Sequence, residues 1–218
     1  ERSRRTRAEL LVRELALFAY VGATQTGKTT LALRELEELT LEHRLPSLIV
    51  DSRRARNLAA FEHAHTLAQA LERVYLRDPA PIAWTPRDQA ELDAAARALE
   101  RVGRCALFID ELGTWNVSEP LAILFRTWAH RSVPVFVTAQ NLLGDLGQLY
   151  LSCGPRLRLF RSTGPSGLDT LRRYYGLEVE SLLALPDFAF IPLDLDRPVR
   201  PESLGAISST SSNARRGS

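Results

Sequence analysis

The chain has 218 residues, of which 45% are hydrophobic and 25% charged, and its formal net charge is +2. These values fit one soluble α/β domain, and no apolar run approaches the length of a membrane span, so we expect neither a membrane-spanning helix nor a signal peptide. The two cysteines, Cys105 and Cys153, lack the spacing of a metal site, which favours a reducing compartment over a structural disulfide.

Apolar runs alternate with helical patterns along the chain, which predicts a mostly parallel sheet built from βα units. The predicted strands are 15–21, 47–51, 81–85, 105–110, 133–138, 156–160 and 188–195. The predicted helices are 28–43, 56–76, 87–102, 118–131, 145–152 and 167–175. We therefore expect an α/β domain over 15–206, preceded by a basic arm at 1–14 and followed by a flexible Ser-rich tail at 207–218.

The first motif is GATQTGKT at 22–29, between the first predicted strand and the first predicted helix. This GxxxxGK[ST] spacing is the Walker A pattern, a loop whose main-chain N–H groups surround a β-phosphate. Lys28 is the only lysine among 28 lysines and arginines, as expected where a slim ammonium fits and a planar guanidinium does not. We predict that ATP is bound by Gly22, Ala23, Thr24, Gln25, Thr26, Gly27, Lys28, Thr29 and Thr30.

The second motif is CALFIDE at 105–111, an apolar run that ends in two carboxylates, as in Walker B. An aspartate at the end of a buried strand beside such a loop holds Mg²⁺ with the loop hydroxyl, so we assign Thr29 and Asp110 to a Mg²⁺ site. Glu111 is the predicted general base that polarises the attacking water, which implies ATP hydrolysis. The alternative is that Asp110 caps a helix and Glu111 is surface charge.

The third motif is the run 133–141, a predicted buried strand that ends in polar residues. Because parallel strands end at one edge of the sheet, Thr138 or Gln140 is expected to reach the γ-phosphate or the attacking water, and we favour Gln140. The alternative for Gln140 is an amide that hydrogen-bonds within its own loop.

The transition state also needs a cation, which a neighbouring subunit can supply as an arginine. We rank Arg131 and Arg156 first, although a surface or ion-paired role is the alternative for every candidate. The full set of candidates is Arg126, Arg131, Arg156, Arg158 and Arg161.

Together these motifs resemble the HerA/FtsK superfamily of P-loop ATPases, within the additional-strand, catalytic-glutamate class. The resemblance rests on 22–29, 108–111, 137–140 and 154–163, in that order along the chain. It implies a P-loop NTPase three-layer sandwich with a mostly parallel central sheet, in which Gln140 is a sensor and 156–160 is an arginine-bearing strand. We expect no barrel, membrane or winged-helix module of the kind that cellular members carry.

A bare motor core of this size is most similar to the genome-packaging ATPases of tailless, membrane-containing double-stranded DNA viruses. That resemblance implies a double-stranded DNA translocase, working as a homo-oligomeric ring, expected to be a hexamer, at a capsid vertex. Its expected location is the host cytoplasm and the virion. Arginine clusters at 2–7 and 53–56 are able to neutralise DNA phosphates, with a solvated arm and a solvated loop as the equal alternative.

Three other functions stay open. A small-molecule kinase would use the segment 161–167 as a lid, but the adjacent Asp110 and Glu111 weigh against it because a kinase must exclude an activated water. A nucleotide-gated scaffold with little turnover would have no use for Glu111. A conjugative or mobile-element DNA-pumping ATPase would share all of the motifs.

Overall fold

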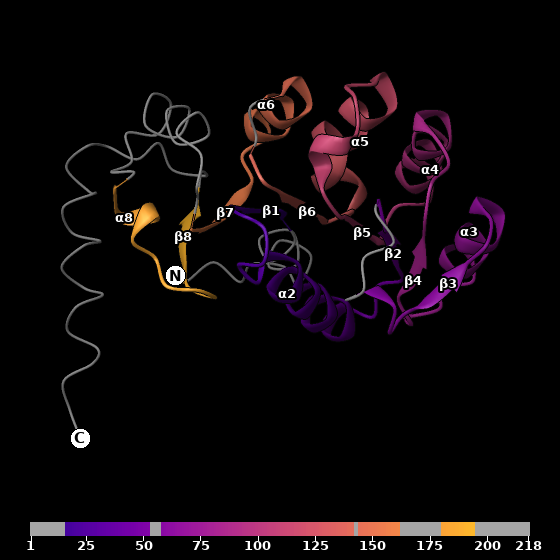
Figure 1. Ribbon diagram of the computed structural model, residues 1–218. Coiled ribbons are helices and arrows are strands. Elements are labelled where there is room, and N and C mark those ends of the chain that lie inside the picture. The colour runs from indigo at the N-terminus through magenta and orange to yellow at the C-terminus, as the bar shows by residue number, and fades with distance from the viewer. Residues whose placement is uncertain (1–15, 53–57, 142–143, 162–179, 195–218) are drawn as a thin grey trace, which may run out of the picture.

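The computed structural model describes residues 16–52, 58–141, 144–161 and 180–194 (Figure 1). Within these residues an eight-stranded sheet has the order β3-β4-β2-β5-β6-β1-β7-β8. All neighbouring strands are parallel except β7 and β8, which are antiparallel. The strands are β1 (Leu17–Val21), β2 (Ser47–Val50), β3 (Glu62–Ala64), β4 (Ile82–Trp84), β5 (Ala106–Ile109), β6 (Val135–Ala139), β7 (Arg156–Phe160) and β8 (Phe190–Asp194).

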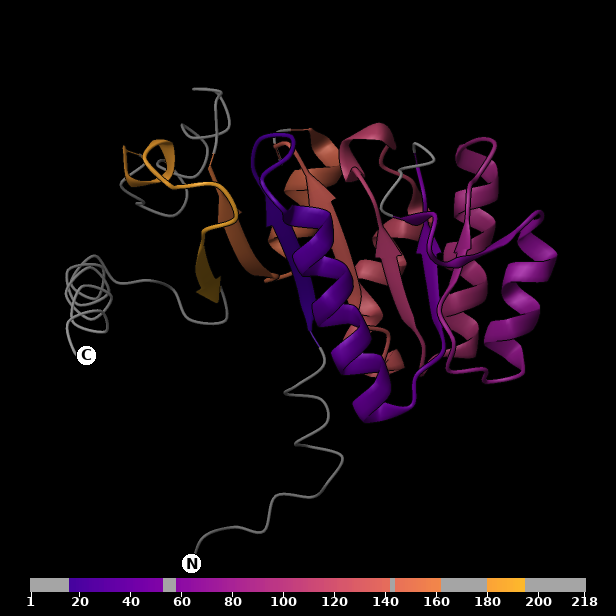
Figure 2. The same ribbon diagram turned by 60° about the horizontal axis from the view of Figure 1, so that its bottom comes forward.

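Helices cover both faces of the sheet. They are α2 (Lys28–His43), α3 (Leu67–Tyr75), α4 (Gln89–Val102), the 3₁₀ turn η2 (Leu112–Thr114), α5 (Glu119–Arg131), α6 (Asp145–Ser152) and α8 (Glu180–Leu183). Figure 2 shows α2 in front of the sheet and α4, α5 and α6 behind it. This arrangement confirms the predicted three-layer α/β sandwich with a mostly parallel sheet. Among the helices that the structure describes, none combines the length and the hydropathy of a membrane span.

The sheet separates two hydrophobic cores. On the α2 face, Phe18 of β1 stacks on Phe136 of β6 with 4.5 Å between ring centroids. On the opposite face, Tyr150 of α6 is fully buried, and its hydroxyl donates to the carbonyl oxygens of Phe18 and Val135 at 3.1 and 2.8 Å. All five residues of β1 are buried because both faces are covered, which explains why this strand is continuously apolar in the sequence. Both cysteines are free thiols.

The prediction of one helix over 56–76 was wrong. The chain instead forms β3, which pairs in parallel with β4, and α3 begins only after Thr66. The Thr66 hydroxyl accepts from the Gln69 N–H at 3.2 Å, while the Gln69 side chain accepts from the His65 N–H at 2.9 Å. This reciprocal cap satisfies N–H groups that the start of a helix leaves open, so the helix begins there.

The other described strands begin or end within two residues of their predicted limits, and α2, α6 and β7 have the predicted bounds. The predicted helix 167–175, the basic arm 1–14, the arginines at 53–56 and the tail 207–218 lie outside the described residues.

The sheet order decides which chain segments meet at the carboxyl edge. Strand β6 lies between β1 and β5. Val21 is in register with Ala139, and Ile109 is in register with Val137. The loops that follow β1, β5 and β6 are therefore adjacent at one edge of the sheet.

Candidate active site

Hydrogen bonds to the flanking strands hold the loop between β1 and α2. The Gly22 N–H donates to the Ala139 carbonyl at 3.2 Å, and the Ala23 N–H donates to the Arg161 carbonyl at 2.8 Å. At Gly22 a Cβ atom would lie 2.7 Å from the Cβ of Phe160, so the close approach of β7 requires glycine. The loop then turns into α2 through Gly27, whose φ of 90° is in the left-handed half of the map.

Lys28 closes this loop from inside. Its ammonium donates to the carbonyl oxygens of Gly22 and Ala23 at 2.8 and 2.6 Å, and the residue is only 8% exposed. Burial lowers the pKa of Lys28, and the negative charges of Glu111 and Asp110 partly oppose that shift. The ammonium therefore lies inside the loop that the sequence predicts to bind phosphate.

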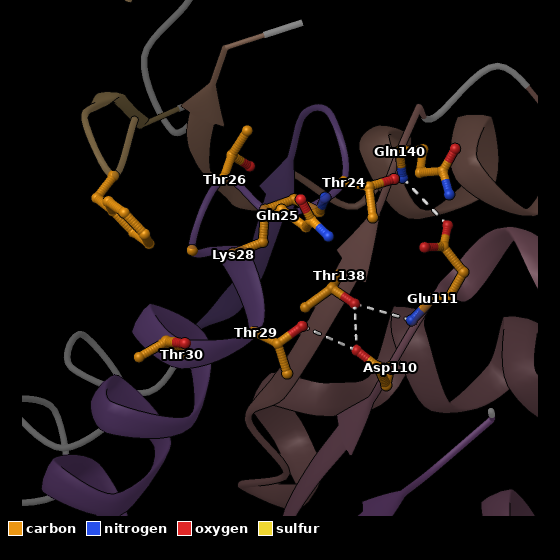
Figure 3. Close-up of a pocket in the computed structure, with 12 residues that line it drawn as sticks. Thr24, Gln25, Thr26, Lys28, Thr29, Thr30, Asp110, Glu111, Thr138 and Gln140 are labelled. Carbon is orange, nitrogen blue, oxygen red and sulfur yellow. Dashed lines mark hydrogen bonds between the residues drawn. The ribbon is translucent and has the colours of Figure 1, made fainter. Parts of the chain in front are cut away.

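Asp110 accepts two hydroxyl hydrogen bonds at the end of β5. Thr29 on the first turn of α2 donates to Asp110 Oδ1 at 3.1 Å, and the buried Thr138 at the end of β6 donates to the same oxygen at 2.8 Å (Figure 3). The helix-cap alternative for Asp110 is wrong, since the N-cap of the following η2 is Glu111 and has no side-chain cap bond.

Two hydrogen bonds hold Glu111, one through its main chain and one through its carboxylate. Its N–H donates to the Thr138 hydroxyl at 2.8 Å, and its Oε1 accepts from the Gln140 N–H at 3.1 Å (Figure 3). Glu111 has φ 55° and ψ 70°, a left-handed conformation that is uncommon outside glycine and that concentrates at functional sites. Its carboxylate is consequently presented at the cavity from a constrained backbone.

The loop, Asp110 and Glu111 line one cavity of about 350 Å³. Gly22 and Ala23 of the predicted ATP-binding run are not among its lining residues. The lining residues are Thr24, Gln25, Thr26, Gly27, Lys28, Thr29, Thr30, Asp110, Glu111, Thr138, Gln140 and Phe188.

Two of these residues change the interpretation of the sequence. Thr138, ranked below Gln140 from the sequence, links the two acids directly, whereas Gln140 has an exposed side chain and contributes its main-chain N–H. The signal for Thr138 was its position at the end of the apolar run 133–138. Phe188 was not predicted as a site residue. No local pattern marks it as one, because it reaches the cavity from the segment before β8.

The structure does not bring Arg131 or Arg156 into the cavity. Arg131 ends α5 at the amino edge of the sheet and pairs with Glu100 at 2.7 Å. Arg156 is the first residue of β7, where its guanidinium lies 5.7 Å from the centroid of the Phe18 ring. Their action in a neighbouring subunit's site remains a prediction. Of the other candidates, Arg161 lies beside the phosphate loop, where its carbonyl accepts from the Ala23 N–H.

The oxygen atoms of Thr29 and Asp110 suit Mg²⁺. Magnesium prefers hard oxygen ligands and is usually held by one or two carboxylates together with substrate phosphates rather than by a full protein cage. A hydroxyl and a carboxylate 3.1 Å apart, beside a phosphate loop, provide that donor set.

No protein-family model and no curated protein sequence matches the chain. The fold is similar to that of the genome packaging NTPase B204 from Sulfolobus turreted icosahedral virus 2 in complex with AMPPCP, with 17% identity and a TM-score of 0.69 over 85% of this chain and 95% of that one. It is also similar to the bacterial conjugative coupling protein TrwBdeltaN70, with 13% identity and a TM-score of 0.54 over 85% and 87% of the two chains. A third similar structure is VirB4 of Thermoanaerobacter pseudethanolicus, with 12% identity and a TM-score of 0.50 over 92% of this chain and 93% of that one. The chain therefore has the P-loop NTPase fold that these structures share.

Proposed function

We propose that this protein is an ATP-driven translocase of double-stranded DNA that acts as a genome-packaging motor. The observation that carries the proposal is the joint placement of Lys28, Asp110 and Glu111 around one cavity at the carboxyl edge of the sheet. The likeness in fold to a viral genome packaging NTPase, over 95% of that chain, supports the choice of packaging. The likeness to a conjugative coupling protein keeps DNA pumping between cells as the second candidate.

The loop residues bind the triphosphate. The Lys28 ammonium, which donates to two carbonyls in this structure, would donate to the β- and γ-phosphate oxygens when ATP is bound. The first N–H groups of a helix have no intrahelical acceptor, so those at the start of α2 would bind the same phosphates. Thr29 and Asp110 would hold Mg²⁺, which would neutralise part of the negative charge of the phosphates. Asp110 is oriented for this task by the hydroxyl of Thr138.

Glu111 prepares the attacking water. Its carboxylate accepts the water proton, while the Gln140 N–H and the Thr138 hydroxyl hold the residue in its constrained conformation. A carboxylate presented this way activates water, which a kinase must exclude, so hydrolysis is favoured over transfer to a small molecule.

The proposed assembly is a ring of six subunits. An arginine from the next subunit would stabilise the charge on the γ-phosphate. Capsid vertex proteins are the proposed docking partners, in the host cytoplasm and the virion.

The test is ATP turnover with Mg²⁺, measured with and without double-stranded DNA. We expect DNA to raise the rate and added salt to weaken that stimulation, because phosphate contacts release counterions. Glu111→Gln should bind ATP but lose about 10²- to 10⁴-fold in turnover. The matched control is Glu37→Gln, on the exposed side of α2, which should turn over like wild type.

Two results would contradict the proposal. The first is Mg²⁺-independent or absent hydrolysis by the wild-type protein. The second is labelled γ-phosphate appearing on a nucleoside or metabolite, which would establish a kinase instead.

A further inference from the structure

Phe188 is the one apolar side chain among the described residues that line the cavity. It lies two residues before β8 and is 73% exposed. The other lining residues are Thr, Gln, Gly, Lys, Asp and Glu, which suit phosphates and metal rather than an apolar surface. An open aromatic face beside a phosphate loop therefore has no role in binding the triphosphate itself.

The chain holds Phe188 in place at some conformational cost. Its φ is 64°, in the left-handed region that a bulky residue rarely adopts. The preceding residue, Asp187, pairs with Arg161 at 2.7 Å, and the Arg161 carbonyl in turn accepts from the Ala23 N–H of the phosphate loop. The segment that carries Phe188 is thereby connected to the loop through Arg161.

The ring itself rests on the loop. A Cβ atom added to Gly27 would lie 2.7 Å from Cδ1 of Phe188, so the edge of the ring occupies the space that glycine leaves open. One part of the ring is thus in contact with the start of α2, and most of its surface remains open toward solvent and the cavity.

The sheet order gives the cavity two chemically different ends. Along the order β5-β6-β1-β7-β8, Glu111 follows β5, Gln140 follows β6, Gly27 lies between β1 and α2, and Phe188 precedes β8. The acid is therefore on one side of the phosphate loop and the aromatic ring on the other. A ligand that fits must carry a reacting phosphate at one end and a flat, polarisable group at the other.

We propose that Phe188 is the platform on which the nucleotide base stacks. This proposal rests on the proposed function and adds to it the site of the base. Stacking on an aromatic ring is sequence-tolerant, because every base has a π-face. Phe188 has no hydrogen-bonding group with which to read the edge of a base. The ring consequently strengthens binding of nucleotides in general and contributes little to the choice between ATP and GTP.

The experiment compares two ligands that share phosphates but differ in the base. Calorimetry measures the Kd of a non-hydrolysable ATP analogue and of inorganic tripolyphosphate, each with Mg²⁺. We expect Phe188→Ala to weaken the analogue about tenfold while the Kd of tripolyphosphate stays unchanged. Phe188→Tyr keeps an aromatic ring, so it should bind the analogue with the affinity of wild type. Leu183→Ala, an equally apolar change at a 52% exposed position in α8, is the matched control and should change neither Kd.

Every other outcome counts against the stacking role. Equal analogue affinity in wild type and Phe188→Ala overturns it while the proposed ATPase stands. Phe188→Asn also removes the ring, but asparagine tolerates the left-handed backbone at this position. If both Phe188→Ala and Phe188→Asn lose affinity for both ligands, the residue shapes the loop and does not bind the base. A wild-type protein that binds neither ligand overturns the proposed function, and this inference with it.

Discussion

Thr138→Val is the sharpest perturbation of the acidic network. Valine keeps the shape of threonine and suits a strand, so no cavity is opened, but it removes the hydroxyl. That hydroxyl donates to Asp110 Oδ1 at 2.8 Å and accepts from the Glu111 N–H at 2.8 Å. Thr138 is 1% exposed, so water does not readily replace either bond.

The two lost bonds set the expected magnitude. A hydrogen bond to a charged acceptor contributes about 1.5–3 kcal/mol, and a buried N–H left without a partner costs about 1–3 kcal/mol. Because Thr29 still donates to Asp110, we take values near the lower limits and expect the free energy of unfolding to fall by about 3 kcal/mol. Glu111 loses one of its two anchors, and a displacement near 1 Å slows chemistry about 100-fold.

The assays are urea unfolding, ATP turnover and the Kd of a non-hydrolysable ATP analogue. Turnover should fall while the Kd stays within about threefold of wild type, because the phosphate loop is untouched. Thr138→Ser is the control: it keeps the hydroxyl and should retain turnover, losing only about 0.8 kcal/mol for its missing methyl group. Wild-type turnover in Thr138→Val, or an equal loss in both variants, would refute the positioning role of Thr138.

Two further predictions follow from the buried ionisable groups. Lys28→Met should abolish triphosphate binding in calorimetry, yet the ligand-free variant should unfold no more easily than wild type, since burial lowers the pKa of Lys28 and so disfavours the charged form in the folded state; a variant that still binds triphosphate would contradict the assignment of Lys28. Burial also raises the pKa of Cys105 from 9.0 to about 12. The folded thiol stays neutral while the unfolded thiol ionises, so its contribution to stability is complete below pH 9 and is lost as the pH rises toward 12. By pH 10 the loss should reach about 1.4 kcal/mol, and urea unfolding at pH 8 and 10 should show a smaller fall in Cys105→Ala than in wild type. Identical falls would mean that the thiol ionises equally in both states.

Local sequence was sufficient to predict which functional residues follow each individual strand. The GxxxxGK[ST] loop, the helix that follows it and the acidic pair after 105–109 are each contiguous, and main-chain geometry at a strand-to-helix turn is set by neighbouring residues. The positions of Lys28, Asp110 and Glu111 were therefore predicted, and the structure brings them to one cavity. Their roles remain predictions until the kinetic tests above.

Only the tertiary structure decided how these ends combine. The insertion of β6 between β1 and β5 joins Thr138 to Asp110, although 28 positions separate them in the chain. Strand β3 forms where the sequence pattern favoured a helix, because pairing with β4 and the cap at Thr66 outweigh a weak local preference. Phe188 reaches Gly27 from 161 positions away. Such contacts form only when strands distant in the sequence pair with one another. The residues that make them therefore carry no periodic pattern in their local sequence.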